Sequence, residues 1–239
     1  MRLDKLLAHC GFGTRKEVKE IIKKGFVSVN DRVVKTDKTQ VDPDKDEVKV
    51  DGEVIAYEDK VYYMLNKPDG YVSATTDNLY PTVVRLIDDY YRDDLFPVGR
   101  LDVDTEGLLL LTNDGHLTHQ LLSPKKHCPK IYYARIDGVV DESDIVAFEQ
   151  GIEIEDYVTQ PSQLRILNVE NGMSEIEVTI YEGKFHQVKR MFLSRGKEVR
   201  YLKRIQMKDL KLDESLELGE YRRLTDEEIN RLKEENMIK

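Results

Sequence analysis

The chain has 239 residues, 40% of them hydrophobic, which is enough for a sizeable core and for two domains. It contains no apolar run near the roughly 20 residues of a membrane helix and no signal-peptide pattern at its N-terminus, so we expect a cytoplasmic protein without a membrane partner. Its two cysteines, Cys10 and Cys128, lack CxxC spacing, which argues against a disulfide framework or a cysteine-rich zinc site.

The formal net charge of -9 hides two basic segments. Residues 1–40 carry ten Lys and Arg against five Asp and Glu, and residues 181–211 carry ten against three. The rest of the chain is therefore strongly acidic. Basic segments on an acidic chain favour local contact surfaces for nucleic acid over a nonspecific polycation. Two solvated helix faces would give the same charge pattern.

A first short helix is predicted over residues 15–24. Thr14 and Glu17 form a T-x-x-E capping box, an apolar stripe follows, and Gly25 supplies a stop. The spacing of the basic residues brings their charges to one side of this helix, which suits a phosphate backbone. These residues are Arg15, Lys16, Lys19 and Lys23.

Residues 26–34 predict a β-hairpin. Apolar and polar residues alternate around Asn30 and Asp31, a dipeptide that tolerates the positive φ of a tight turn. One further short strand is expected near residues 48–55. The N-terminal region is therefore expected to pack small helices on a small sheet.

The polar residues 56–61 indicate a linker to a second region, in which strand-like and helix-like runs alternate. Many strands follow one another without a helix between them, which favours an α+β fold with a mixed, mainly antiparallel sheet. Strands are expected over residues 61–67, 107–113, 130–138, 162–169 and 174–183, and helices over 81–91, 116–123, 142–151 and 186–196. A capping box at Thr225 and Glu228 predicts a C-terminal helix.

Residues 99–115, GRLDVDTEGLLLLTNDG, place four acidic side chains around a leucine run that should be buried. A calcium loop is a poor fit, because Asn113 occupies the twelfth position, where a bidentate Glu is needed. A zinc site on His116 and His119 lacks a third and a fourth ligand at recognisable spacing. Paired carboxylates could serve a glycoside hydrolase, but nothing else in the chain supports one. We therefore expect no metal site.

A further interpretation needs only one reactive carboxylate. Arg100 and Asp102 lie on the same side of an extended segment, at the mouth of the buried strand. Lys189 and Arg190 are candidates to pair with this carboxylate, and a nearby cation keeps an aspartate ionised, as a nucleophile requires. A structural ion pair would give the same pattern, so the residues alone leave both interpretations open. Asp104, Glu106 and Asp114 are expected to be turn, cap or ion-pair residues.

The first region resembles the S4-like RNA-binding domain, first seen in a small-subunit ribosomal protein. The matching residues are Arg2-Leu3-Asp4-Lys5, Gly11, Thr14-Arg15, Gly25 and Val27-Ser28-Val29-Asn30. Asp31 stands where that family has glycine in the turn. The resemblance implies a module that docks on structured RNA and performs no chemistry. Its expected RNA contacts are Arg2, Lys5, Arg15, Lys16, Lys19 and Lys23.

Nearly the whole chain resembles the RsuA family of pseudouridine synthases. The matching blocks, in order, are MLNKPDGYVS, GRLDVDTEGLLLLTNDG, SPKKHCPKIYYARI, and EGKFHQVKRMF followed by YLKR and LGEYRRLTDEEI. Lys208 stands where the family has a glycine, in an expected strand away from the motifs. The resemblance implies an S4-like RNA-binding domain over residues 1–57 and a catalytic domain of the pseudouridine synthase type over residues 58–239.

The resemblance also implies a mechanism that uses no metal or organic cofactor. The enzyme detaches uracil from a ribose of folded RNA, rotates it and rejoins it through carbon, with Asp102 as the nucleophile. Tyr132 would stack on the flipped base or shuttle a proton, and Lys189 would pair with Asp102. Arg100 would fill the vacated space or hold the adjacent phosphate, and Leu202 would form part of the apolar wall over the base.

The expected substrate is ribosomal RNA, with Arg190 as a further RNA contact. The DVDTEGLLLLTNDG and SPKKHC blocks resemble most the enzymes of the small subunit, so 16S rRNA or a partly assembled small ribosomal subunit is the expected partner of a monomeric enzyme. Two alternatives stay open: a large-subunit rRNA pseudouridine synthase of the same family, and a non-catalytic RNA-binding factor for ribosome assembly.

Overall fold

The computed structural model describes residues 1–123 and 126–234, and the chain forms two compact units. The first comprises Met1–Lys60 and Ile87–Leu95, and the second comprises Val61–Leu86 and Phe96–Lys239. The sequence predicts a domain boundary between residues 57 and 58, which places residues 87–95 in the second domain. In the structure these residues belong to the first unit. No helix within the described ranges is long and apolar enough to cross a bilayer.

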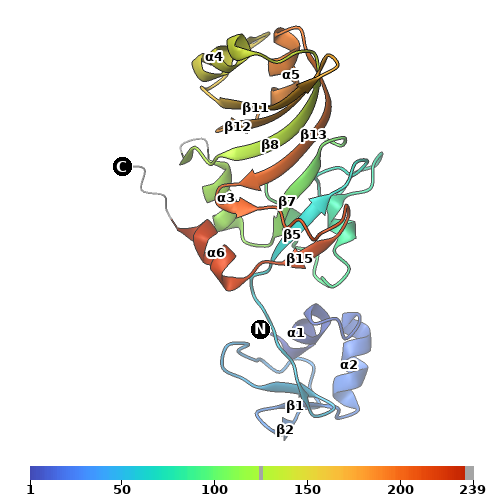
Figure 1. The fold of residues 1–239 in the computed structure, drawn as a ribbon. Coiled ribbons are helices and arrows are strands. Elements are labelled where there is room, and N and C mark those ends of the chain that lie inside the picture. The colour runs from blue at the N-terminus through green and yellow to red at the C-terminus, as the bar shows by residue number, and fades with distance from the viewer. Residues whose placement is uncertain (124–125, 235–239) are drawn as a thin grey trace. The chain divides into compact units, whose positions relative to one another are not determined.

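The first unit packs two helices on a small sheet (Figure 1). Helices α1 (Leu3–His9) and α2 (Arg15–Lys23) cover a four-stranded sheet of order β2-β1-β3-β4. The strands are β1 (Val27–Val29), β2 (Arg32–Val33), β3 (Val48–Val50) and β4 (Glu53–Val54). Leucine, valine and isoleucine side chains from both helices and from β1 and β3 form its core, because each amphipathic element has one apolar face to bury.

Most of the elements predicted for this unit are confirmed. The capping box of Thr14 and Glu17 forms at the start of α2, and Asn30 and Asp31 both take positive φ, at 50° and 60°, in the β1–β2 turn. The prediction of a single strand near residues 48–55 is wrong. Asp51 and Gly52, at φ of 51° and 83°, turn the chain there and divide it into β3 and β4.

An ion-pair network neutralises part of the basic face predicted for the first unit. The buried carboxylate of Asp4 accepts hydrogen bonds from Arg2 and Arg15, and Asp37 lies 3.4 Å from the ammonium of Lys19. Burial raises the pKa of Asp4, but the hydrogen bonds from the two guanidinium groups outweigh it and hold this pKa below its usual range.

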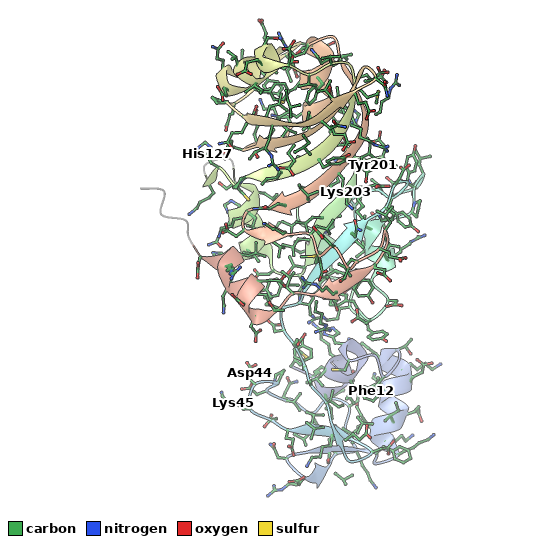
Figure 2. The ribbon with its side chains drawn as sticks, viewed as in Figure 1. Phe12, Asp44, Lys45, His127, Tyr201 and Lys203 are labelled. Atoms are coloured by element: carbon green, nitrogen blue, oxygen red, sulfur yellow. The ribbon has the colours of Figure 1, made fainter. Side chains whose placement is uncertain are left out.

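Replacing Asp4 with Asn should destabilise the first unit by about 2 kcal/mol, because a buried carboxylate that accepts two charged hydrogen bonds is lost. Amide hydrogen exchange of residues 3–50 in the full chain measures this loss. Asp44→Asn is the matched control, since Asp44 is exposed in a loop of the same unit (Figure 2). The folded pKa is the lower one, so the contribution of Asp4 is present above about pH 4. It should vanish as the pH falls through the depressed value.

Residues 81–91 form no continuous helix, contrary to the prediction. Only a 3-10 turn, η1 (Val83–Leu86), is present, and the chain after it belongs to the first unit. Arg92 lies there with its guanidinium carbon 5.5 Å from the ring centre of Tyr57 and 4.9 Å from that of Tyr90. This cation–π packing gives the end of the segment contacts with aromatic rings of the first unit. An isolated helix would not have these contacts.

The second unit is built on a nine-stranded sheet whose main path runs β11-β12-β8-β13-β7-β5-β15 (Figure 1). Only the β13–β7 pair on this path is parallel, so the predicted mixed, mainly antiparallel sheet is confirmed. The path strands are β5 (Tyr62–Lys67), β7 (Glu106–Thr112), β8 (Lys130–Asp137), β11 (Gln163–Glu170), β12 (Met173–Ile180), β13 (Glu198–Met207) and β15 (Tyr221–Arg223). The short strands are β6 (Phe96–Pro97), β9 (Glu153–Ile154), β10 (Tyr157–Val158) and β14 (Leu210–Lys211).

The helices of this unit lie where the sequence predicts them. They are α3 (Gly115–Leu122), α4 (Glu142–Gln150), α5 (Gln187–Ser194) and α6 (Asp226–Lys233). Helix α4 packs on β11 and α5 on β13, whereas α3 and α6 contact each other (Figure 1). Leu108 and Leu110 of β7 enter a core shared with α3 and α6, which makes β7 a rigid base for the loop that precedes it.

The backbone geometry at two positions, 107 and 208, favours glycine. A Cβ at Gly107 would lie 2.3 Å from the carbonyl oxygen of Arg204, so only glycine lets β7 and β13 pair this closely. Lys208 takes φ of 53° in the turn between β13 and β14, rather than a strand conformation, which explains the family's glycine there. In this chain its ammonium donates to the carbonyls of Arg231, Leu232 and Glu234, at the C-terminal end of α6.

Candidate active site

A narrow pocket of about 60 Å³ opens between the loop before β7, the start of α5, and the strands β8 and β13. Five residues named from the sequence line it together: Arg100, Asp102, Tyr132, Lys189 and Leu202.

Asp102 faces two basic side chains. Its side chain is 28% exposed, and its carboxylate oxygens lie 3.6 Å from Lys189 Nζ and 3.6 Å from His186 Nε2. Lys189 donates a hydrogen bond of 2.6 Å to Asp104 Oδ1. The predicted Lys189–Asp102 ion pair is therefore present, and Lys189 is shared between two carboxylates. An accessible aspartate beside cations can serve as a nucleophile or a base.

The other acidic residues of the cluster have structural contacts. Burial raises the pKa of Asp104, but the hydrogen bond from Lys189 outweighs it, so this pKa falls below its usual value. Glu106 accepts a hydrogen bond from Tyr201 Oη, a residue of β13 (Figure 2), and Asp114 caps the start of α3. Asp104 and Asp114 thus have the ion-pair and cap roles expected of them, whereas Glu106 instead accepts a hydrogen bond from a tyrosine of the neighbouring strand.

The remaining pocket wall combines apolar and polar groups. Tyr132 and Leu202 are buried on β8 and β13, and Ile180 and Val188 extend the apolar surface. Thr105 also lines the pocket, and its buried hydroxyl has no hydrogen-bond partner among residues 1–123 and 126–234. A buried hydroxyl without a partner is costly, so it is available to a polar atom of a bound base.

Lys67 holds the backbone of the Asp102 loop in place. Its fully buried ammonium donates to the carbonyls of Pro68, Val103 and Thr105, each at 2.9 Å. The hydroxyl of Ser73 donates to the carbonyl of Leu101 and accepts from its N–H. Burial lowers the pKa of Lys67 to about 8, so at neutral pH it still carries the proton and can serve all three acceptors.

The start of α5 is also fixed. His186 takes φ of 48°, a left-handed conformation that costs about 1–3 kcal/mol for a residue with a Cβ. The buried amide of Gln187 holds this turn, because it accepts from Lys184 N and donates to Glu182 Oε1, both at 3.0 Å. The His186 ring is thus held beside Asp102. Among the described residues, no group of three His, Cys, Asp or Glu could hold a metal ion.

Comparison with known proteins assigns this geometry to a family. The model of the RNA pseudouridylate synthase family matches residues 61–194, and that of the S4 domain matches residues 1–48. An RNA pseudouridine synthase of Bacillus subtilis is 50% identical over 98% of this chain and 99% of its own. The chain belongs to the RNA pseudouridine synthase family.

Relatives within this family confirm the predicted RsuA resemblance. The ribosomal small subunit pseudouridine synthase A of Haemophilus influenzae is 41% identical over 97% of this chain and 99% of its own. A ribosomal large subunit pseudouridine synthase B of Bacillus subtilis is 38% identical over 97% and 95%. A crystal structure of a pseudouridylate synthase, 40% identical, superposes with a TM-score of 0.68 over 97% of this chain and 99% of that one.

The remaining predicted contacts of this pseudouridine synthase lie elsewhere. Arg190 is not among the residues of the pocket wall and pairs with Asp156, so its predicted pairing with Asp102 is wrong. The six predicted RNA contacts of the S4-like module belong to the first unit. Three of them, Arg2, Arg15 and Lys19, form ion pairs with Asp4 or Asp37.

Four residues of the pseudouridine synthase site escaped the sequence analysis. Lys67 and Thr105 lie in the first two family blocks, and His186 and Gln187 lie in the EGKFHQVKRMF block. Their place in those blocks was the available signal. The contacts of Lys67 with the Asp102 loop and of His186 with Asp102 join segments far apart in the sequence, which no spacing indicates.

Proposed function

We propose that this enzyme isomerises one uridine of ribosomal RNA, in the small-subunit 16S rRNA, with Asp102 as the nucleophile. The observation that carries the proposal is the placement of Asp102 in one pocket with Arg100, Tyr132, Lys189 and Leu202. The names of the relatives support a ribosomal substrate. We further propose that the enzyme works as a cytoplasmic monomer on rRNA or on a partly assembled small subunit.

The chemistry begins with a base outside the RNA stack, because a stacked uridine is unreachable. Arg100, exposed at the pocket, fills the vacated space or holds the adjacent phosphate. Tyr132 stacks on the extruded uracil, and base–aromatic stacking contributes about 1–3 kcal/mol. Leu202 closes the apolar side of the pocket.

Asp102 then acts on the ribose, at C1′ as a nucleophile or at C2′ as a base. The N1–C1′ bond breaks with its electrons moving to uracil, and the base rotates. Carbon C5 then bonds to C1′ as the carboxylate leaves C1′ or returns the proton to C2′. C5 loses its hydrogen as a proton, and N1 takes up a proton. Lys189 and His186 lie on opposite oxygens of the carboxylate. The product is an isomer of uridine, so the reaction consumes no co-reactant.

Mapping pseudouridine in rRNA from cells with and without the gene tests the function and the target together. We expect one 16S position to lose pseudouridine in the deletion strain and to regain it with the wild-type gene. Loss at a 23S position would instead identify a large-subunit enzyme, which the large-subunit relative makes the second candidate. Unchanged rRNA in the deletion strain would indicate a non-catalytic assembly factor.

The S4-like module should contribute to RNA binding through the exposed lysines of α2. Lys16 and Lys23 form no ion pair in the described part of the chain, so their substitution leaves the Asp4 network intact. Lys16→Gln with Lys23→Gln should weaken rRNA binding and make the slope of log affinity against log salt shallower by about 0.7–0.9 per lost phosphate contact. Lys45→Gln, in an exposed loop of the same module (Figure 2), is the control. Equal salt slopes for both variants would show that α2 is not part of the surface that binds RNA.

A further inference from the structure

Phe185 is an exposed aromatic side chain next to the catalytic pocket. It is 73% exposed, and its ring stacks on that of His186 with 3.7 Å between centroids and 19° between planes. One face of the phenyl ring is thus covered by imidazole, and the exposed fraction leaves the other face to solvent. An exposed phenyl ring loses the hydrophobic stabilisation that burial gives, so its position calls for a partner.

The stack is held in one orientation. His186 has a left-handed backbone, with φ of 48°, and its carbonyl accepts the first hydrogen bond of α5, from Arg190 N. The amide of Gln187 ties Lys184 to Glu182 across the same turn. A rigid ring loses little conformational entropy when a ligand stacks on it.

The stack also adjoins the reacting groups. His186 lines the pocket, and its Nε2 lies 3.6 Å from the carboxylate of Asp102. Phe185 stacks on the same imidazole and is not itself among the residues that line the pocket. Arg100 and Lys184, which also line the pocket, bring positive charge to this rim, as the phosphates of a strand entering it require.

We propose that Phe185 and His186 form a stacking platform for the base of a nucleotide beside the extruded uridine. This inference rests on the proposed function, because it assigns a second base of the same RNA substrate. Extruding a uridine unstacks its neighbours, and the open face of Phe185 gives one of them a new stacking partner. Stacking on an aromatic ring accepts any base, so the platform adds affinity and sets the direction of the strand rather than its sequence.

Phe185→Ala tests the platform, with Phe185→Trp and Leu193→Ala beside it. Leu193 lies on α5, is 67% exposed, and is absent from the pocket wall. On an rRNA fragment containing the mapped uridine, Phe185→Ala should raise KM about tenfold, which corresponds to about 1.4 kcal/mol of lost stacking, with kcat within about twofold. Trp should restore KM, and Leu193→Ala should match the wild type. The salt slope of binding should stay unchanged, because no phosphate contact is lost.

Fragments with an abasic ribose on either side of the uridine give the second readout. The wild type should lose about tenfold in KM on one of the two fragments, and Phe185→Ala should lose nothing further on that fragment. An unchanged KM for Phe185→Ala, or additive losses on both fragments, would overturn the platform. A wild-type enzyme that modifies neither the fragment with all bases present nor a partly assembled small subunit would instead overturn the proposed function.

Discussion

Asp102→Asn is expected to abolish the release of tritium from rRNA labelled at uridine C5, by at least about 10⁴-fold, while rRNA binding persists. The amide has the shape of the carboxylate, but it can neither attack C1′ nor accept a proton from C2′. Removing a nucleophile from other enzymes lowers kcat by this order or more. Tritium release under single-turnover conditions measures the chemical step, and filter binding of the same rRNA measures affinity.

Asp104→Asn is the matched control for this experiment. Asp104 lies two residues further along, is more exposed than Asp102, and accepts a hydrogen bond from Lys189. Its loss leaves Lys189 to Asp102 alone, so turnover should change by less than about tenfold. Turnover of Asp102→Asn at the wild-type rate would show that Asp102 takes no part in the chemistry. Equal loss in both variants would indicate that the pair of carboxylates acts as a unit.

Long elements with strong local signals were predictable from the sequence. The capping boxes at Thr14 and Thr225 form as predicted, and the apolar runs of β5 and β7 are buried strands. The helix predicted over residues 81–91 is absent because the chain from Ile87 to Leu95 packs in the first unit, where Arg92 lies over the ring of Tyr57, 35 positions earlier in the chain. Local periodicity cannot distinguish such a long-range contact from the apolar face of a helix.

The sequence blocks identify which residues form the candidate site, but they do not show how these residues are arranged in space. Lys189 and Arg190 are neighbours in sequence, but successive residues of a helix point about 100° apart. Lys189 therefore reaches Asp102 and Asp104, and Arg190 pairs with Asp156. The sequence likewise predicts a basic face on α2, but in the structure Asp4 and Asp37 form ion pairs with two of its residues. Pairings across long sequence separations decide which charges stay available to RNA.

Lys67→Met should lower kcat by at least about 100-fold, although Lys67 contacts no atom of the proposed substrate. Its ammonium holds three carbonyl oxygens of the segments around the Asp102 loop. Methionine fills the space but donates nothing, so the three carbonyls lose the ammonium as a donor, although the carbonyl of Val103 keeps a second hydrogen bond, from Gly70 N. Each acceptor left unsatisfied costs about 1–3 kcal/mol. The loop must then shift to reach other donors. A displacement of about 1 Å at a reacting group can cost about 100-fold in rate.

A local effect on the loop differs measurably from unfolding of the domain. For Lys67→Met, amide exchange should accelerate in residues 101–106 while the leucines of β7 stay protected, since their core does not involve Lys67. Lys203→Met is the control, because the side chain of Lys203 on β13 (Figure 2) makes no hydrogen bond or ion pair among residues 1–123 and 126–234, and its backbone pairing in the sheet is unaffected by the substitution. Ser73→Ala removes the other restraint on this loop without touching a buried charge, and it should lower kcat about tenfold. Wild-type kcat in both Lys67→Met and Ser73→Ala would show that the position of Asp102 does not depend on these restraints.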